Sequence, residues 1–381
     1  GGSVVSTTAF IIKKSQNFDY QGQFVRLLDG SSEQEKSRIF LSAIKNKTKN
    51  RFFNISTNYF KYIKGKVIAY NMPYVFVSNI EKKERFDDHF SISEGIKTGQ
   101  NDRFIRFWYE VSSNSIGKFN ESKKWVIHSK GGDFRRWYGN LLWVVNWGNN
   151  GSEMKLNGKA GFQGRENYGS IGGVWSKISS GSFATRLQPE GSTFDSACPG
   201  YFPKGNISSN EAIAILSSLP GQNYLTSINP TMNFQVGNIS SMPIPSGTNW
   251  KERANSLAVK LIDISKTDWD SFELSWGFKS FPLLSKDFIS NNLNKTYESL
   301  RISWVSIVEQ MLKLEEENNN IFINAYELQD TLKPNFSIKN ITINCNPVYR
   351  YGEKIDKEIQ EQKIRTDTIK EFISYSVGCM F

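Results

Sequence analysis

The residues best suited to chemistry in this sequence are cations mixed with aromatic rings between residues 122 and 186. Ten lysines and arginines fall there against three carboxylates, together with five of the ten tryptophans. Positive groups hold phosphates and flat rings stack on bases, so this composition favours a surface that contacts nucleic acid. Glycine is also dense there, and it lets loops turn sharply and brings backbone N–H groups close to a ligand.

The same residues have a second explanation, which is an ordinary solvated surface over a β core. Residues 141–147 (LLWVVNW) indicate a buried strand whose tryptophans belong to the core. Basic residues are common on protein surfaces, and lysine usually lies in water. Charge and aromatic content alone therefore leave both explanations open.

A polar turn precedes this stretch. Residues 94–101 (EGIKTGQN) predict a strand that enters a glycine-containing turn, and the chain leaves it as a second strand at residues 104–111. The turn lacks the full G-x-x-x-x-G-K-[ST] pattern of a phosphate-binding loop, so we do not expect nucleotide hydrolysis. Exposed lysine, threonine, glutamine and asparagine side chains are suited to phosphates and base edges.

These two segments supply the predicted DNA contacts. Positive groups would track phosphates, and a few polar side chains would read bases in the major groove. The predicted contact residues are Lys97, Thr98, Asn101, Lys124, Lys130, Arg135, Arg136, Trp137, Tyr138, Arg165, Lys177 and Arg186.

The sequence offers few residues for metal binding or for acid–base catalysis. Two histidines and three separated cysteines provide no zinc spacing, so we expect no metal site and free thiols. Isolated carboxylates such as Glu94 and Asp133 form no recognisable acid–base pair, which disfavours a self-contained hydrolase. Residues 71–74 (NMPY) resemble the N-P-P-Y loop of adenine methyltransferases. We interpret this as coincidence, because methionine replaces the first proline and no glycine-rich cofactor loop precedes it.

The whole chain points to a polyanionic partner. Its 381 residues carry a formal charge of +10 and contain no apolar run long enough to cross a bilayer. We expect a cytoplasmic protein without a membrane partner. The start at glycine and the end within an apparent element lead us to expect a portion of a longer polypeptide.

The predicted fold is α+β. We expect strands at residues 3–13 and 23–28, and a helix at 31–42 with Phe40, Leu41 and Ile44 on its apolar side. Short strands follow, interrupted by a helix at 208–219, as expected for irregular β structure. Helices from residue 249, at 293–317 and at 353–375 complete the chain, and the acidic and amide run at 315–320 is expected to end the second of them.

Several segments resemble PglX, the family of adenine-specific DNA methyltransferases of BREX phage-defence systems. The resemblance is specific at residues 125–140 (WVIHSKGGDFRRWYGN) and extends to 169–176 (GSIGGVWS) and 183–187 (FATRL). Residues 94–101 are similar to the G-x-x-T-G turn that opens target-recognition regions, and residues 2–10 (GSVVSTTAF) to the last strands of the family's catalytic domain.

The resemblance implies a domain organisation and a function. Residues 1–80 would end a methyltransferase catalytic domain, 81–246 would form a β-rich target-recognition domain that binds duplex DNA, and 247–381 a helical region. The family transfers a methyl group from S-adenosylmethionine to adenine N6, but its cofactor motif and N-P-P-Y loop are not in this sequence. Whether this chain is itself an enzyme is therefore left open.

An alternative function is a protein-interaction module. Amphipathic helices and aromatic strands would then supply apolar anchors, and the basic surface would meet an acidic partner. That partner would be another BREX component or a phage protein that mimics DNA.

Overall fold

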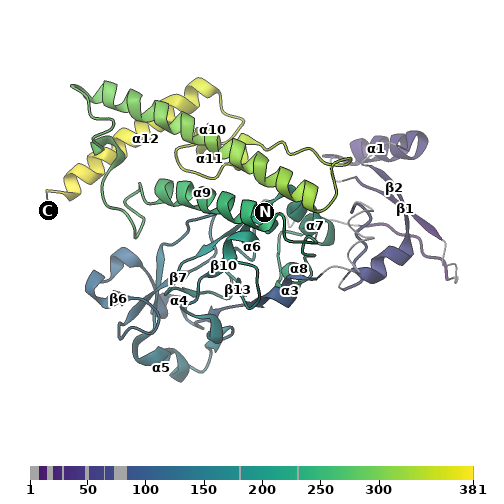
Figure 1. Ribbon diagram of the computed structural model, residues 1–381, viewed down its shortest axis with the longest axis horizontal. Helices are drawn as coiled ribbons and strands as arrows, with labels where there is room; N and C mark the ends of the chain where they lie inside the picture. The colour runs from purple at the N-terminus through teal and green to yellow at the C-terminus, as the bar shows by residue number, and fades with distance from the viewer. Residues whose placement is uncertain are drawn as a thin grey trace. The chain divides into compact units, whose positions relative to one another are not determined.

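The computed structural model (Figure 1) describes residues 8–14, 20–27, 30–47, 51–63, 65–72, 84–179, 182–229 and 231–380. The chain divides into two compact units, Gly1–Glu81 and Lys82–Phe381. The domain boundaries expected at residues 80 and 246 stay predictions.

The Gly1–Glu81 unit is built on a two-stranded antiparallel sheet. Strand β1 (Gln21–Val25) pairs with β2 (Phe52–Ser56), and helix α1 (Glu33–Asn46) lies between them in the chain, before the 3₁₀ helix η1 (Thr57–Tyr62). Helix α1 begins where expected, because the Ser32 side chain accepts a hydrogen bond from the Glu35 N–H.

Two expectations for this unit are corrected. The predicted strand at residues 3–13 is absent from its described part, since residues 8–13 have no regular structure. The buried face of α1 consists of Ile39 and Ala43, whereas Phe40, Leu41 and Ile44 are exposed. Residues four apart share a helix face. The buried stripe, Ile39 and Ala43, therefore lies one position away from the predicted stripe, and the predicted side chains face solvent.

Three sheets form the β-rich part of the Lys82–Phe381 unit. The first is antiparallel, with the order β11-β10-β13-β3; the second is mixed, with the order β12-β7-β8-β5 and β6 beside β7; the third pairs β4 with β9. The strands are β3 (Phe90–Ser93), β4 (Ile96–Lys97), β5 (Ile105–Phe107), β6 (Ile116–Gly117), β7 (Trp125–Ser129), β8 (Trp143–Asn146), β9 (Gly161–Phe162), β10 (Gly172–Trp175), β11 (Thr185–Gln188), β12 (Thr193–Phe194) and β13 (Gly200–Pro203).

Helices account for most of the remaining regular structure, and the predicted α+β class is confirmed. The helices of this unit are α3 (Phe86–His89), α4 (Asn101–Phe104), α5 (Gly148–Leu156), α6 (Ser209–Ser217), α7 (Leu219–Ile228), α8 (Val236–Ser240), α9 (Lys251–Trp269), α10 (Leu293–Ala325), α11 (Pro347–Tyr351) and α12 (Lys357–Gly378). Single 3₁₀ turns are η2 (Trp108–Glu110), η3 (Ser113–Ser115), η4 (Arg165–Asn167), η5 (Pro282–Leu284) and η6 (Ile338–Asn340). In Figure 1 the strands lie between α5 on one side and α9 and α10 on the other.

Aromatic and aliphatic side chains from all three sheets pack into one core. Phe104, Val126, Trp147 and Phe194 are among its buried members. The strand predicted around Trp143 is present as β8, and its Val144 and Val145 are fully buried. This core holds the connecting loops of the sheets in fixed positions.

Helix α10 is longer than predicted. The expectation that residues 315–320 end it was wrong, because Glu315, Asn318 and Asn319 are buried and bonded inside the protein. The Asn318 side-chain amide donates to the Ala214 carbonyl at 3.0 Å, and the Asn319 side-chain oxygen accepts from the Leu219 N–H at 2.7 Å. Polar residues in a helix do not end it when neighbouring elements satisfy their hydrogen bonds.

Candidate nucleic-acid interface

Four of the twelve predicted contact residues are exposed: Lys97, Asn101, Lys124 and Arg165. They come from β4, the start of α4, the approach to β7 and the turn η4. Three parts of the chain, around residues 97–101, 124 and 165, therefore present polar side chains to solvent.

The pairing of β4 with β9 brings Lys97 beside the chain near Lys159. Lys97 is the register partner of Gly161, and both Lys97 and Lys159 are exposed. Gly99 follows with φ +73°, and a Cβ atom there would lie 2.7 Å from the Lys159 Cβ. This close approach and the left-handed backbone both require glycine at position 99.

Contacts around Trp147 connect the remaining cations to the same loops. The Arg165 guanidinium donates to the Asn150 side-chain oxygen at 3.0 Å and lies 6.0 Å from the centre of the Trp147 ring. The Trp147 N–H donates to the Lys124 carbonyl at 2.7 Å. Arg103 lies 3.9 Å from the Glu153 carboxylate of α5. These contacts bring Arg103 of α4, Lys124 and Arg165 close to α5 and to Trp147.

We call this set the basic loop surface. It consists of Lys97, Arg103, Lys124, Lys155, Lys159 and Arg165, with the carboxylates Asp102, Glu153 and Glu166 interspersed. Within the described part of the chain, Lys97, Lys155 and Lys159 have no carboxylate at ion-pair distance. Their charges are therefore available to a ligand.

The basic loop surface includes three cations that the sequence-based prediction missed. Arg103, Lys155 and Lys159 were not among the predicted contacts. Lys155 and Lys159 stand on either side of Gly158, which has φ +66°. A glycine between two lysines is a signal for an exposed basic turn, although it does not reveal that the turn lies against Gly99.

Lys130 and Lys177 are half-buried and already paired. The Lys130 ammonium lies 3.2 Å from the Asp195 carboxylate, and the Lys177 ammonium contacts the Glu94 carboxylate. Each would have to leave a carboxylate in order to bind a phosphate.

Asp195 is a buried charge held by several partners. Burial alone would raise the pKa of its carboxyl group, but bonds from His128 and the Ala197 N–H, together with the nearby Lys130 charge, lower that pKa from 3.8 to about 2. Because the folded-state pKa is the lower one, this carboxylate stabilises the fold above about pH 4, and the contribution is lost as the pH falls toward 2.

Replacing Asp195 by asparagine should remove this pH-dependent contribution. We expect the variant to lose about 2 kcal/mol of unfolding free energy at pH 7, and much less near pH 2.5, because a shift of one pKa unit corresponds to about 1.4 kcal/mol. Urea unfolding of both proteins at pH 7, 5 and 3 measures the difference. Parallel stability curves across that range would contradict the assignment.

Arg136 and Trp137, which were predicted to contact DNA, are interior. Arg136 is 3% exposed and makes a two-pronged ion pair with Glu315 of α10, at 2.9 and 2.6 Å. Its guanidinium also donates to the Ser217 carbonyl at 2.8 Å, and the Trp137 indole N–H donates to Glu315 at 2.7 Å. These side chains join the β-rich part to α10.

Arg135 is also occupied by protein partners. It is buried, with its guanidinium 3.8 Å from the Asp268 carboxylate and hydrogen-bonded to the Asn344 side chain. Burial raises the pKa of Asp268, and the charge of Arg135 acts against that rise. The neighbouring Tyr138 ring is buried as well. Both side chains are thus buried, and their predicted contacts with DNA stay predictions.

Arg186 and Thr98 complete the buried group. Arg186 is 1% exposed, with its guanidinium 3.5 Å from the Ser176 hydroxyl and 3.6 Å from the Cys198 sulfur. Burial lowers the pKa of Arg186 and raises the pKa of the Cys198 thiol to about 11. The Thr98 hydroxyl is turned inward and donates to Asn101 at 2.6 Å. Neither residue reaches a ligand on the surface.

The tryptophans do not provide stacking surfaces for bases. Trp125, Trp137, Trp147 and Trp175 are buried, and Trp143 is half-buried against Phe107 with ring centres 3.9 Å apart. The aromatic richness of the segment therefore reflects its core. The exposed lysines and arginines of the segment, which lie beside a few exposed apolar side chains such as Leu156, suit a duplex backbone better than unstacked bases.

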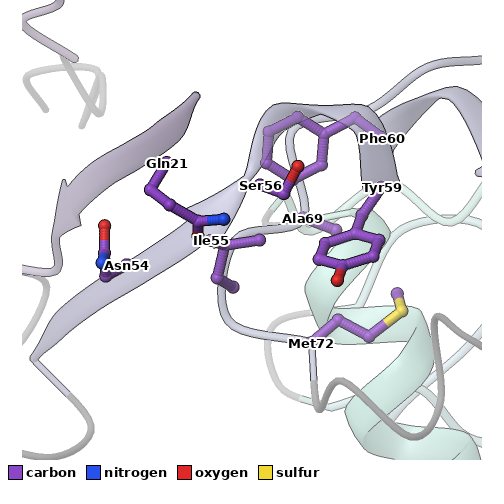
Figure 2. Close-up of a pocket in the computed structure, with 8 residues that line it drawn as sticks. All are labelled: Gln21, Asn54, Ile55, Ser56, Tyr59, Phe60, Ala69 and Met72. Atoms are coloured by element: carbon purple, nitrogen blue, oxygen red, sulfur yellow. The ribbon is translucent and has the colours of Figure 1, made fainter. Parts of the chain in front are cut away.

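A separate pocket lies in the Gly1–Glu81 unit (Figure 2). It has a volume of about 240 Å³, and its described lining residues are Gln21, Asn54, Ile55, Ser56, Tyr59, Phe60, Ala69 and Met72. None of these eight side chains is a cation or a carboxylate. Met72 belongs to the NMPY run, whose Pro73 and Tyr74 lie outside the described residues.

The described residues contain no group of three histidine, cysteine or acidic side chains placed to hold a metal ion. All three cysteines are free. Of the helices that the structure describes, none has the length and apolar character needed to cross a membrane.

Comparisons with known proteins confirm the resemblance expected from residues 125–140. The chain is 32% identical over 400 residues to the adenine-specific methyltransferase PglX of Lacticaseibacillus casei (strain Zhang), a match that covers 100% of this chain and 32% of the relative. It is 33% identical over 386 residues to the adenine-specific methyltransferase BrxX of Escherichia coli O9:H4 (strain HS), covering 99% and 30%. The chain thus spans about a third of the length of these relatives. No family model matches it.

Proposed function

We propose that this chain, which is similar along its whole length to part of the PglX and BrxX adenine-specific methyltransferases, recognises duplex DNA for such an enzyme in a BREX phage-defence system. The observation that carries the proposal is the basic loop surface. Its free lysines are fixed on loops that a rigid core positions, whereas Arg135, Arg136 and Arg186 of the same region are buried.

The physical basis is phosphate neutralisation. Six exposed cations on neighbouring loops match a backbone that carries a charge every few ångströms along a duplex. Such contacts fix the orientation of a protein on DNA without reading its sequence. The polar side chains of the Gly99 turn lie among these cations and supply the groups that read bases.

Methyl transfer itself is not a role that we propose for this chain. The sequence contains no glycine-rich cofactor loop and no complete N-P-P-Y loop. We therefore assign binding of S-adenosylmethionine, and chemistry at adenine N6, to polypeptide other than this chain. The role of this chain is to position DNA for that reaction.

A salt titration tests the proposal. With all six cations of the basic loop surface at phosphates, the logarithm of the affinity for duplex DNA should fall with the logarithm of salt concentration with a slope of roughly −5. Fluorescence anisotropy of a labelled duplex between 50 and 300 mM salt measures this slope. Absence of binding at 50 mM salt, or a slope near zero, would end the proposal.

A protein-docking role is the second candidate, and exposed apolar side chains favour it. Ile302 is 71% exposed, and Val305 lies one turn further along the same α10 helix. Such a pair provides an apolar anchor for a partner. Replacing Ile302 by aspartate should weaken pull-down of other BREX components. It should leave the salt dependence of DNA binding unchanged. Unchanged pull-down would argue against docking at this helix.

A further inference from the structure

The turn that follows β4 is fixed more firmly than its exposure suggests. Ile96 and Phe104 on its two sides are fully buried, and the Gln100 carbonyl accepts from the N–H groups of Arg103 and Phe104, both at 3.2 Å. Gly99 packs against the Lys159 backbone. The side chains at positions 100 and 101 therefore leave a rigid base, which direct reading of DNA requires.

The two amides of this turn offer different hydrogen-bonding groups. Gln100 is exposed, and within the described part of the protein its amide has no hydrogen-bond partner, so it presents both a donor and an acceptor. Asn101 is also exposed, but its side-chain oxygen accepts from the buried Thr98 hydroxyl at 2.6 Å. Its NH₂ group therefore points away from Thr98 and presents donors.

We infer that Gln100 and Asn101 determine the DNA sequence recognised, with Gln100 reading an adenine and Asn101 reading an adjacent guanine or thymine. Glutamine pairs through both amide atoms with adenine N6 and N7, and a donor alone matches the acceptors O6 and N7 of guanine or O4 of thymine. This inference rests on the proposed function and adds which side chains would read bases and which would hold phosphates.

The surrounding cations have the complementary role. Lys97 precedes the turn, and Lys159 packs against it. Ammonium groups hold phosphates as point charges and are indifferent to sequence. Lys97 and Lys159 thus set the register of the turn on the duplex, and Thr98 is a positioning residue that orients Asn101 without contacting DNA.

Selection of bound duplexes from a randomised library separates these roles. For Gln100→Ala we expect the preference for one adenine to weaken roughly 5- to 150-fold, the range of one lost bidentate contact. Asn101→Ala should relax the adjacent position. Asn101→Asp should shift that position toward cytosine, since a carboxylate accepts from cytosine N4. For the two alanine variants, the slope of the logarithm of DNA affinity against the logarithm of salt concentration should stay within about one unit of that of the unaltered protein.

Thr98→Val provides a variant of nearly the same shape that changes no exposed atom. We expect it to relax only the base position assigned to Asn101, which a purely structural role for Thr98 would not do. Circular dichroism melting of each variant controls for folding.

The outcomes distinguish this inference from the proposed function. Unchanged base preferences in Gln100→Ala and Asn101→Ala, combined with a reduced salt slope in Lys97→Ala/Lys159→Ala, would overturn the inference and leave the proposed function standing. Failure of the unaltered protein to bind any duplex would overturn both.

Discussion

Replacing Glu315 by alanine is expected to lower the free energy of unfolding by about 3–5 kcal/mol, because it leaves the buried guanidinium of Arg136 without its carboxylate. Glu315 is 0% exposed and accepts bonds from both Arg136 and the Trp137 indole. Removing one partner of a buried ion pair costs far more than the pair contributes, since the remaining charge stays in a poorly solvated place.

Glu317 gives a matched control on the same helix. Its ion pair with Arg253 is 3.4 Å long and exposed on both sides, so Glu317→Ala should cost less than about 1 kcal/mol. A second comparison is the double variant Arg136→Met/Glu315→Leu, which should recover most of the lost stability because no unpaired charge remains. Urea unfolding measures all three. Equal effects of Glu315→Ala and Glu317→Ala would show that the buried pair is not what joins the sheets to α10.

The triple variant Lys97→Ala/Lys159→Ala/Arg165→Ala is expected to lose most of the DNA affinity. Each phosphate contact contributes about 0.9 to the log–log salt slope, so three lost contacts should flatten the slope by roughly 3 and weaken binding on the order of 100- to 1000-fold at 0.1 M salt. Stability should change little, because all three side chains are exposed.

Three lysines of the helical region provide the control for this variant. Lys260, Lys279 and Lys313 are equally exposed but lie in or beside α9 and α10, away from the basic loop surface. Replacing them by alanine removes the same net charge, and we expect a slope within about one unit of that of the unaltered protein. A similar loss in both triple variants would mean that binding depends on overall charge and not on this surface.

The parts of the fold that local patterns determine could be predicted from the sequence. The apolar run at Trp143 forms a strand, and Ser208 caps α6 through the Glu211 N–H. The buried stripe of α9 at Ala254, Leu257 and Leu261 follows its 3.6-residue period. In each case neighbours in the sequence supply the deciding contacts.

Burial of the arginines could not be predicted, because their partners are distant. Arg136 and Glu315 are 179 residues apart, and nothing near Arg136 indicates that a carboxylate will meet it. The sequence pattern of a basic residue beside tryptophans is the same whether the tryptophans stack on bases or fill a core, so the pattern cannot distinguish the two. For the same reason the place of Lys159 in the candidate site could not be predicted, because the pairing of β4 with β9 brings it there.

The similarity to PglX and BrxX identifies the kind of protein but not the residues that meet DNA. The resemblance was expected from the sequence to be specific at residues 125–140, yet Arg135, Arg136 and Trp137 in that run are interior. A segment can therefore resemble a family through residues that pack inside the protein, while the proposed DNA contacts lie on loops outside that segment.

Hydrogen exchange with and without duplex DNA tests the central claim most directly, since it reports on each segment of the protein separately. The account predicts slower backbone exchange on DNA binding at residues 96–103 and 155–168, with residues 133–139 unchanged. Protection of residues 133–139, with the two loop segments unaffected, would contradict it.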